Sequence, residues 1–347
     1  MRLPRPLGIS GPSLWLPAGR QSVAEAVAAG LLDQDTADEL GLQGLPVAEL
    51  APPEMAVEAG RSALRAAGLD ARAVGLVLHA WIHYQGHDLW SPAHFIADRL
   101  GAEDAVPVGV QQVCNGGAAA VELAAARLFV EPGLGHALVT TADAFADPGF
   151  DRWSGDYGIA YGDGATALVL HHLPDGANGR SADLVLHSLS TVAVPRLERM
   201  HRGDDPFSPA ARSLGPRVDI RRTKKAYLRA EGLEAFTGAS ARALRTAVES
   251  CLADAGLRAT GDTPLRYVVA PRLGRKTVDL AYAPLLTKLT GAELLRPGAD
   301  TGHLGAGDTA ATLADLRTHG TLATGEYALI VSAGAGFTWS CLLVSGA

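Results

Sequence analysis

A helical pattern that occurs twice constrains the fold of this 347-residue chain more than any other feature. Residues 54–69 predict a helix that ends at Gly68, where glycine can adopt the left-handed conformation of a helix stop, and an apolar strand follows. Residues 240–257 repeat this pattern, with the glycine at Gly256 and another apolar strand after it. We therefore expect two copies of one αβ unit.

The two copies also share a short turn ahead of an alanine-rich helix. In the first half, residues 1–180, the turn carries Cys114, and in the second half, residues 181–347, it carries His303 and Asp308. Two copies that pack about a pseudo-twofold axis would bring both turns to one site. The repeat therefore predicts that the cysteine meets the polar pair, with chance similarity of alanine-rich helices as the alternative.

Cys114 stands between an apolar strand predicted over 106–113 and a helix of small residues that begins at Asn115. The first amides of a helix have no partner within it and carry partial positive charge, so they favour a thiolate over a thiol. This placement suits a nucleophile for acyl transfer. The alternative is a small buried side chain at a strand-to-helix corner.

Composition argues against several other classes of protein. With 48% hydrophobic residues the chain can bury a full core, while a net charge of −7 and only 5% aromatic residues disfavour nucleic-acid binding. Its apolar runs are shorter than the ~20 residues of a membrane span. Cys114, Cys251 and Cys341 are widely spaced, so we expect no disulfide, no zinc framework and a cytoplasmic protein.

Four segments, in chain order, carry a family resemblance: VQQVCNGGA at 110–118, YGDGATA at 161–167, GHLGAGDTAA at 302–311 and AGAGFTWS at 333–340. Together they resemble the thiolase-fold enzymes of the β-ketoacyl-acyl-carrier-protein synthase III type. The resemblance implies an α/β protein with the thiolase fold, five αβαβα layers from two duplicated halves, and a homodimer. It also implies that Cys114 takes an acyl group from coenzyme A or an acyl carrier protein, with no resident cofactor.

The resemblance extends to the site residues, with two departures. The family's oxyanion hole maps to the backbone amides of Cys114 and, approximately, Ala335. Arg272 replaces the family's histidine, and Asp308 replaces its asparagine with a carboxylate that would repel an enolate. His303 supplies a new imidazole, suited to accept a proton from an attacking alcohol or amine. Asp308 is expected to orient that ring, to act as the base itself or to cap the helix.

These departures favour the branch of the family whose members are acyltransferases in natural-product pathways. We expect transfer of an acyl group from acyl-Cys114 to a hydroxyl or amine of a small-molecule acceptor, without decarboxylation. A decarboxylating synthase that primes a polyketide, with His303 alone in the site, is the first alternative. A non-catalytic subunit that supports an active homologue is the second, and the presence of Cys114 argues against it.

Further candidates for substrate binding come from loops and from the residue after the nucleophile. The loop 79–90 concentrates histidine and tryptophan where active-site loops of such folds lie. The spacing of its histidines allows a metal, but no third ligand supports one, so we expect none. Arg272 either clamps a substrate carboxylate or is a surface side chain. The candidates are Trp81, His83, Trp90, Asn115 and Arg272, and the family resemblance implies that Trp90 lies near a subunit interface.

Residues 194–236, between the two repeats, form a long insertion rich in arginine and lysine. As a lid, this segment would bind the phosphates of coenzyme A or the acidic face of a carrier protein. The alternative is a solvated excursion whose cations pair with neighbouring acids such as Asp204 and Asp205.

Overall fold

The computed structural model describes residues 1–174, 181–258 and 265–347. Within them, ten strands form one mixed sheet in the order β10-β9-β11-β12-β8-β1-β7-β6-β4-β5. The first half supplies β1 (Arg2–Trp15), β4 (Val74–Ala80), β5 (Val106–Val110), β6 (His136–Asp143) and β7 (Gly164–His172). The second supplies β8 (Leu184–Ala193), β9 (Leu265–Val269), β10 (Glu293–Leu295), β11 (Tyr327–Gly334) and β12 (Thr338–Gly346). The expected boundary at 180/181 falls at residues 175–180, outside the described residues.

The strand order is the same in both halves when each is followed from its outer edge inward. In the first half it is β5-β4-β6-β7-β1, and in the second it is β10-β9-β11-β12-β8. The pairings correspond as well, because β4 and β9 each lie between two parallel neighbours and the next pairs inward are antiparallel. β1 and β8 join the halves edge to edge. This correspondence confirms the expected duplication.

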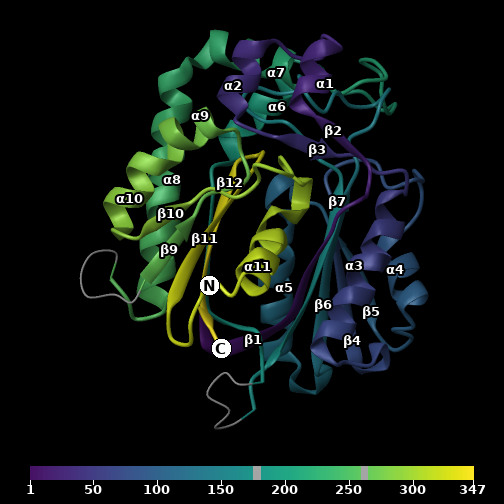
Figure 1. Ribbon diagram of the computed structural model, residues 1–347, viewed down its shortest axis with the longest axis vertical. Helices are drawn as coiled ribbons and strands as arrows, with labels where there is room; N and C mark the ends of the chain where they lie inside the picture. Colours follow the sequence, from purple (N-terminus) through teal and green to yellow (C-terminus); the bar gives the residue numbers. More distant parts are fainter. Residues whose placement is uncertain (175–180, 259–264) are drawn as a thin grey trace.

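The helices complete five layers (Figure 1). Between the two halves of the sheet lie α5 (Gly116–Val130) and α11 (Asp308–Thr318), which contact each other. The outer faces are covered by α3 (Pro52–Ala67) and α4 (Pro92–Leu100) on the first half, and by α8 (Leu233–Asp254) and α10 (Ala283–Thr290) on the second. The predicted αβαβα arrangement of the thiolase fold is therefore confirmed.

Helix α5 is apolar around most of its circumference because it is a central helix. It packs on β4, β6 and β7 and against α11. Residues 113–130 are long and apolar enough to cross a membrane, yet half of that segment is buried inside the protein. A helix packed between sheet layers needs no membrane to account for its composition.

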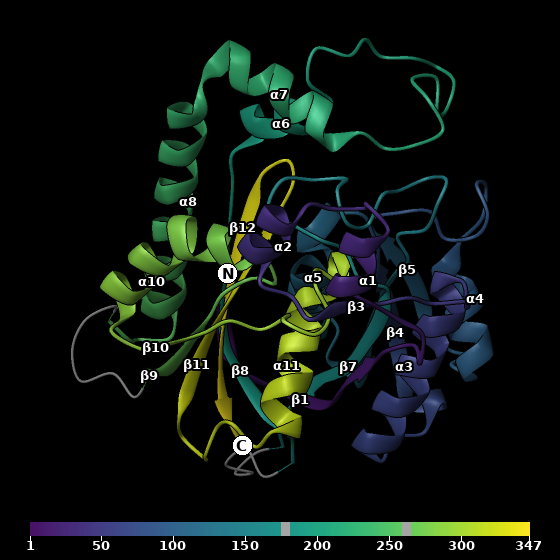
Figure 2. The same cartoon turned by 45° about the horizontal axis from the view of Figure 1, so that its top comes forward.

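The remaining elements gather at the end of the sheet where α5 and α11 begin (Figure 2). They are β2 (Arg20–Ser22), β3 (Gly44–Pro46), α1 (Val23–Ala28), α2 (Gln34–Leu40), α6 (Arg199–Arg202), α7 (Ile220–Glu231) and α9 (Arg275–Thr277). The basic insertion 194–236 forms α6 and α7 and continues into the first turn of α8. The insertion therefore lies on the same side of the molecule as the two central helix N-termini.

The strand predicted over 106–113 is shorter than expected and ends at Val110. The backbone of Val113 takes a φ of 48°, in the left-handed region that neither a strand nor an α-helix contains. A 3₁₀ turn over Val113–Asn115 then leads into α5. The nucleophile candidate therefore lies in a sharp turn rather than at the end of the strand.

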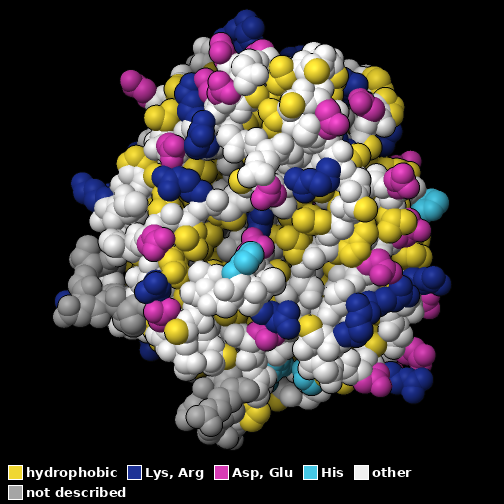
Figure 3. Space-filling model, in the orientation of Figure 1, with side chains coloured by type: hydrophobic (Ala, Val, Ile, Leu, Met, Phe, Trp, Pro, Cys, Tyr) yellow, Lys and Arg dark blue, Asp and Glu magenta, His cyan; other side chains and the backbone are white. Residues whose placement is uncertain are grey.

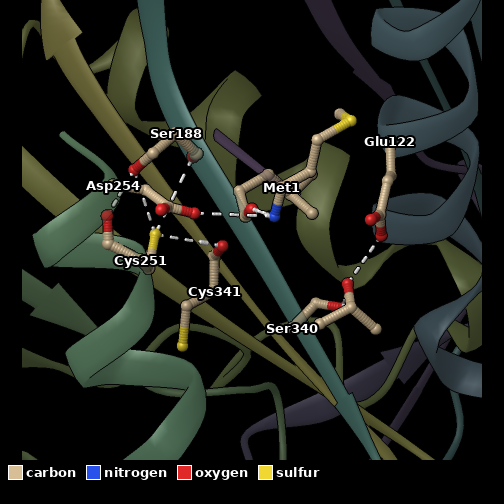
Figure 4. Close-up of polar contacts among 9 residues, drawn as sticks. Met1, Glu122, Ser188, Cys251, Asp254, Ser340 and Cys341 are labelled. Atoms are coloured by element: carbon tan, nitrogen blue, oxygen red, sulfur yellow. Dashed lines mark hydrogen bonds and ion pairs between the residues drawn. The ribbon is translucent and has the colours of Figure 1, made fainter. Parts of the chain in front are cut away.

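The other two cysteines are buried between α8 and the strands of the second half (Figure 4). The Sγ of Cys251 lies 3.3 Å from the Oγ of Ser188 and 3.2 Å from the carbonyl oxygen of Cys341. Burial raises the pKa of Cys251 to about 11 and that of Cys341 well above its ordinary value. All three cysteines of the chain are free, and Cys114 is the one with partial exposure.

Candidate active site

The turn that carries Cys114 and the turn after His303 contact each other at the centre of the molecule. The first is Val113–Asn115, and the second is a 3₁₀ turn over Gly305–Gly307 that leads into α11. The two glycines that open α5 permit the approach, because a side-chain carbon at either position would press on Ala306. The two turns therefore share one site, as the repeat predicts.

His303 and Asp308 form a buried pair beside the second turn. The Nδ1 of His303 lies 2.6 Å from one carboxylate oxygen of Asp308, and the other oxygen accepts the backbone N–H of Leu304 at 2.9 Å. His303 and Asp308 are 2% and 6% exposed. Within the described residues the carboxylate bonds no amide of α11. Of the three roles expected for Asp308, this geometry corresponds to orienting the ring.

Cys114 lies close enough to His303 for its charge to act on the ring. Burial lowers the pKa of His303, but the Asp308 carboxylate and the Cys114 thiolate raise it by more, so that it stands well above its ordinary value. Since Asp308 holds Nδ1, the atom left for the sulfur is Nε2, which has no hydrogen-bond partner among the described residues.

A mostly apolar cavity of about 280 Å³ lies under α7 and α8, and one of its lining residues, Tyr282, is near enough to Cys114 to be affected by its charge. Burial and the charge of Cys114 raise the pKa of Tyr282, one of its lining residues, to about 12. The aromatic side chains of its wall are Tyr157, Phe236, Tyr282, Phe337 and Trp339. A largely apolar cavity of this kind can hold part of a substrate and exclude water from it.

Asp143, the last residue of β6, is a site residue that sequence reasoning missed. Its carboxylate accepts the N–H groups of Ile82 at 2.8 Å, His83 at 2.9 Å and Ala306 at 3.0 Å. Complete burial raises its pKa to about 7, although these amides and His303 act to lower it. Asp143 therefore joins the loop after β4 to the second turn. Its position at the carboxyl end of a buried parallel strand was the available signal.

Tyr161 is a second site residue to which the sequence assigned no role. Its ring meets the ring of His303 edge to face, with 5.2 Å between centroids. The chain on either side is hydrogen-bonded to His303, whose N–H donates to the carbonyl of Ala160 and whose carbonyl accepts the N–H of Gly162. The segment 161–167, quoted above for the family resemblance, therefore also holds the imidazole in place.

The hairpin between β11 and β12, which contains Ala335, lies against the residue after Cys114. Gly334 approaches Asn115 so closely that a side chain on the glycine would meet the backbone nitrogen of Asn115. Asn115 is fully buried, and its Nδ2 donates to the Oγ of Ser340 at 3.0 Å, while its Oδ1 has no partner among the residues that the structure describes. The hairpin therefore lies where it can present an amide to the site, while the side chain of Asn115 faces β12.

Arg272 is 3% exposed, so its alternative assignment as a surface side chain is wrong. One terminal nitrogen donates to the Oγ of Thr301 at 2.8 Å, and the other pairs with Asp315 of α11. Only Nε has no partner among the described residues. The guanidinium therefore ties the loop after β9 to α11, and most of its capacity to clamp a carboxylate is used within the protein.

The three candidates of the loop 79–90 have different surroundings. Trp81 stacks on the ring of His79 next to β5. His83 packs against Phe145, and burial lowers its pKa. Trp90 is 39% exposed. Only His83 is joined to the site, through the hydrogen bond from its N–H to the carboxylate at the end of β6.

Five of the ten lysine and arginine side chains in the basic segment 194–236 form ion pairs with acidic side chains of the described residues. The ion pairs are Arg199 with Asp204 and Glu231, Arg202 with Glu198, Arg217 with Asp147, Arg222 with Asp205 and Lys224 with Asp156. Lys225 and Arg229 remain exposed on α7. Cations and acids are likewise interspersed on the face in Figure 3. These ion pairs are what the alternative of a solvated surface excursion predicts. The side chain of Lys224, however, points into the protein.

Models of 3-oxoacyl-[acyl-carrier-protein] synthase III match the chain in two places. Residues 108–189 match the synthase model, and residues 266–345 match the model of its C-terminal part. A curated relative, β-ketoacyl-[acyl-carrier-protein] synthase III 5 of Streptomyces coelicolor, is 38% identical over 121 residues, which are 34% of each chain. The match thus spans about a third of that relative's length.

Solved structures extend the similarity to the whole chain. ChlB3, described as an acyltransferase, superposes with a TM-score of 0.88 at 31% identity, and the match covers 98% of both chains. The 3-oxoacyl-[acyl-carrier-protein] synthase III of Aquifex aeolicus superposes with a TM-score of 0.75 at 18% identity, over 98% of this chain and 99% of that one. The similarity to the Aquifex aeolicus enzyme supports the fold alone. The 31% identity with ChlB3 also shows a relationship in sequence.

Proposed function

This chain belongs to the β-ketoacyl-acyl-carrier-protein synthase III family, and on that premise we propose that it is an acyltransferase with Cys114 as its nucleophile. It moves an acyl group from a coenzyme A or carrier-protein thioester, through acyl-Cys114, to a hydroxyl or amine of a small molecule in secondary metabolism. No decarboxylation occurs. The observation that carries the proposal is the His303–Asp308 pair, which leaves Nε2 for Cys114.

In the first half-reaction, the Cys114 thiolate attacks the thioester carbonyl of the donor. A tetrahedral oxyanion forms, and the backbone amides of Cys114 and Ala335 stabilise it; such donors typically contribute ~3 kcal/mol each. When the carbon–sulfur bond of the donor breaks, the leaving thiolate takes the proton of the His303 imidazolium. The products are a free donor thiol, acyl-Cys114 and a neutral His303.

In the second half-reaction, neutral His303 acts as a general base. Acylation has removed the negative charge of Cys114, which is one of the causes that raise the pKa of His303. The pKa therefore falls, and Nε2 can accept the proton of the acceptor hydroxyl or amine as it attacks acyl-Cys114. The Cys114 thiolate leaves, the acylated acceptor departs, and the thiolate–imidazolium pair is restored.

The same residues are poorly arranged for decarboxylation. An enolate needs hydrogen-bond donors or positive charge at its oxygen, and a carboxylate offers only acceptors. Asp308 stands where the family has an asparagine, and its oxygens are engaged by His303 and Leu304. Arg272 stands where the family has a histidine, and its terminal nitrogens are engaged elsewhere. These contacts favour acyl transfer over condensation.

Every group in this route is part of the chain or of the two substrates, so we expect no resident metal or cofactor. Activity should therefore survive dialysis against EDTA. A chain whose three cysteines are all free is suited to a reducing compartment, and we expect the enzyme to be cytoplasmic.

We expect the enzyme to be a homodimer that pairs along β5. This strand is an outer edge of the sheet, and edge strands are open to pairing with another chain. Large apolar side chains are exposed on β5 and α5, namely Val106 (47%), Leu123 (49%) and Val130 (77%). Light scattering after gel filtration checks this expectation, and a monomer at micromolar concentration would contradict it.

Intact-protein mass spectrometry tests the proposal most directly. The enzyme is mixed with acetyl-, butyryl-, benzoyl- and lauroyl-coenzyme A and with the corresponding acyl carrier proteins, then chased with malonyl-carrier protein. A mass gain on Cys114 that malonyl-carrier protein does not discharge supports acyl transfer. Discharge with release of carbon dioxide would make the protein a condensing enzyme, and no labelling by any donor would favour the non-catalytic subunit.

A further inference from the structure

A buried ion pair connects helix α7 to the wall of the candidate active site. The ammonium of Lys224 lies 2.5 Å from one carboxylate oxygen of Asp156, and the other oxygen accepts the hydroxyl of Tyr161 at 3.0 Å. The side chains of Lys224 and Asp156 are 14% and 1% exposed. A buried ion pair tends to hold its geometry, because separating the charges leaves one of them uncompensated in a low dielectric.

The Asp156 carboxylate is the junction between three parts of the chain. It accepts the N–H of Tyr157 at 2.6 Å in addition to the two side chains above. Its backbone carbonyl accepts the Nε of Arg221, one turn of α7 before Lys224, at 3.1 Å. The guanidinium of Arg221 also stacks over the ring of Tyr157. Two side chains of helix α7, Arg221 and Lys224, therefore anchor the helix to Asp156.

The contacts continue from Asp156 to the imidazole. The ring of Tyr161 meets the ring of His303, and the backbone on both sides of Tyr161 is hydrogen-bonded to His303. Lys224 also lines the apolar cavity under α7 and α8. A displacement of α7 would thus change both the roof of the cavity and the support of the ring that serves as base.

We infer that Asp156 is a positioning residue that couples the position of α7, through Lys224 on one side and Tyr161 on the other, to the orientation of His303. The inference rests on the proposed acyl transfer, because the step it affects is the one assigned to His303. The basic insertion 194–236 is then a lid, and docking of this lid orients His303 for its role as the general base. Substrate that fills the cavity under α7 favours the docked lid and so favours a correctly oriented ring.

A double-mutant cycle between Lys224 and Tyr161 tests the coupling. Lys224→Met removes the ammonium but keeps the apolar stem, and Tyr161→Phe keeps the ring on His303 but removes the hydroxyl. The matched control is Lys225→Met, which changes the exposed neighbour on the same helix. Each enzyme is acylated with the donor that labels the wild type, and discharge of acyl-Cys114 by 2-aminoethanol is followed by mass spectrometry.

We expect each single variant to slow discharge about tenfold and the double variant to be no slower than the singles, because both changes interrupt one chain of contacts. Acylation should slow less than discharge, because His303 only protonates the leaving group in that step, and Lys225→Met should change neither step. A double variant slowed about a hundredfold would mean independent effects and would overturn the coupling. So would a Lys224→Met enzyme that discharges at the wild-type rate.

Two further measurements keep this test decisive. If Lys224→Met does not fold, Asp156→Asn takes its place in the cycle, since asparagine keeps the shape and one acceptor oxygen. If no donor acylates the wild type, the proposed function fails, and the coupling is judged from the His303 ring resonance in NMR spectra. That resonance should move in Lys224→Met and Tyr161→Phe but not in Lys225→Met; equal spectra in all variants contradict the inference.

Discussion

The two turns at the centre of the molecule share one backbone plan but carry different chemistry. The middle residue of the first is Cys114, and the middle residue of the second is Ala306. The helix that follows opens with Gly116 in one half and with Asp308 in the other. Because the turns touch where Ala306 meets the first glycines of α5, the second copy has no space for a large side chain at the position equivalent to the cysteine.

This difference explains why the second half places its polar groups on either side of the contact. His303 precedes the turn and Asp308 follows it, and the two side chains meet at 2.6 Å around it. The first half contributes the charge that acts on His303, and the second half contributes the ring and its carboxylate. In the proposed reaction, the duplicated scaffold would thus divide the work between its copies, with the nucleophile on one turn and the proton carrier beside the other.

The largest effect should come from removing the nucleophile. We expect Cys114→Ala to form no acyl-enzyme with any donor, because the remaining cysteines are buried and burial raises their pKa. The double variant C114A/A306C sharpens the comparison between the turns. It moves the thiol to the equivalent position, where Ala306 is fully buried, and should also remain unlabelled in intact-mass spectra. Labelling of that variant would show that the turns are interchangeable.

The next largest effect concerns the ring. We expect His303→Ala to slow discharge of acyl-Cys114 by about 10² to 10⁴, the usual contribution of a positioned general base. Acylation should slow less, since it loses only the imidazolium that stabilises the thiolate and protonates the leaving group. Single-turnover mass spectrometry separates the two steps, and His87→Ala on the exposed loop serves as the control. Equal slowing of both steps would mean that His303 serves the thiolate rather than the acceptor.

Asp308→Asn tests how the carboxylate acts on the ring. Asparagine can keep the bond from the Leu304 N–H but removes the charge that raises the pKa of His303, so we expect a lower His303 pKa in an NMR titration. We also expect discharge to slow by about 10 to 10² at neutral pH, because an amide no longer fixes the tautomer. An unchanged His303 pKa would leave Asp308 with a structural role only.

Asp308→Asn should also change how the free energy of unfolding depends on pH. The folded pKa of His303 is raised above its ordinary value of about 6.5, so the charged ring contributes stability that is fully present below that value. This contribution is lost as the pH rises through the folded pKa. The advantage of the wild type over Asp308→Asn in urea unfolding should therefore shrink from neutral to alkaline pH.

Sequence reasoning predicted the parts of the site that lie within one motif and missed those that depend on distant pairings. The repeat and the helix start singled out Cys114, His303 and the duplication, because glycine stops and strand spacing are local signals, and the family resemblance supplied the five-layered thiolase fold. The strand end before Asp143 marks a candidate position but not its partners, and Asp156 has no local signal, since the roles of both come from amides and side chains far away in the chain. A sequence does not indicate which buried carboxylate will receive a lysine from an inserted helix.

The smallest effect, and the one that tests the junction between the halves, concerns Asp143. Its folded pKa of about 7 is raised by burial above the ~3.9 of an unfolded aspartate, so the protonated form contributes stability that is fully present below about pH 4 and lost as the pH rises to about 7. Asp143→Asn cannot titrate there. Its stability in urea should fall short of the wild type most at acidic pH, with the gap narrowing toward pH 7. A gap that stays constant between about pH 4 and pH 7 would mean that Asp143 is ionised in the folded protein over that range and acts only as an acceptor for the amides of Ile82, His83 and Ala306.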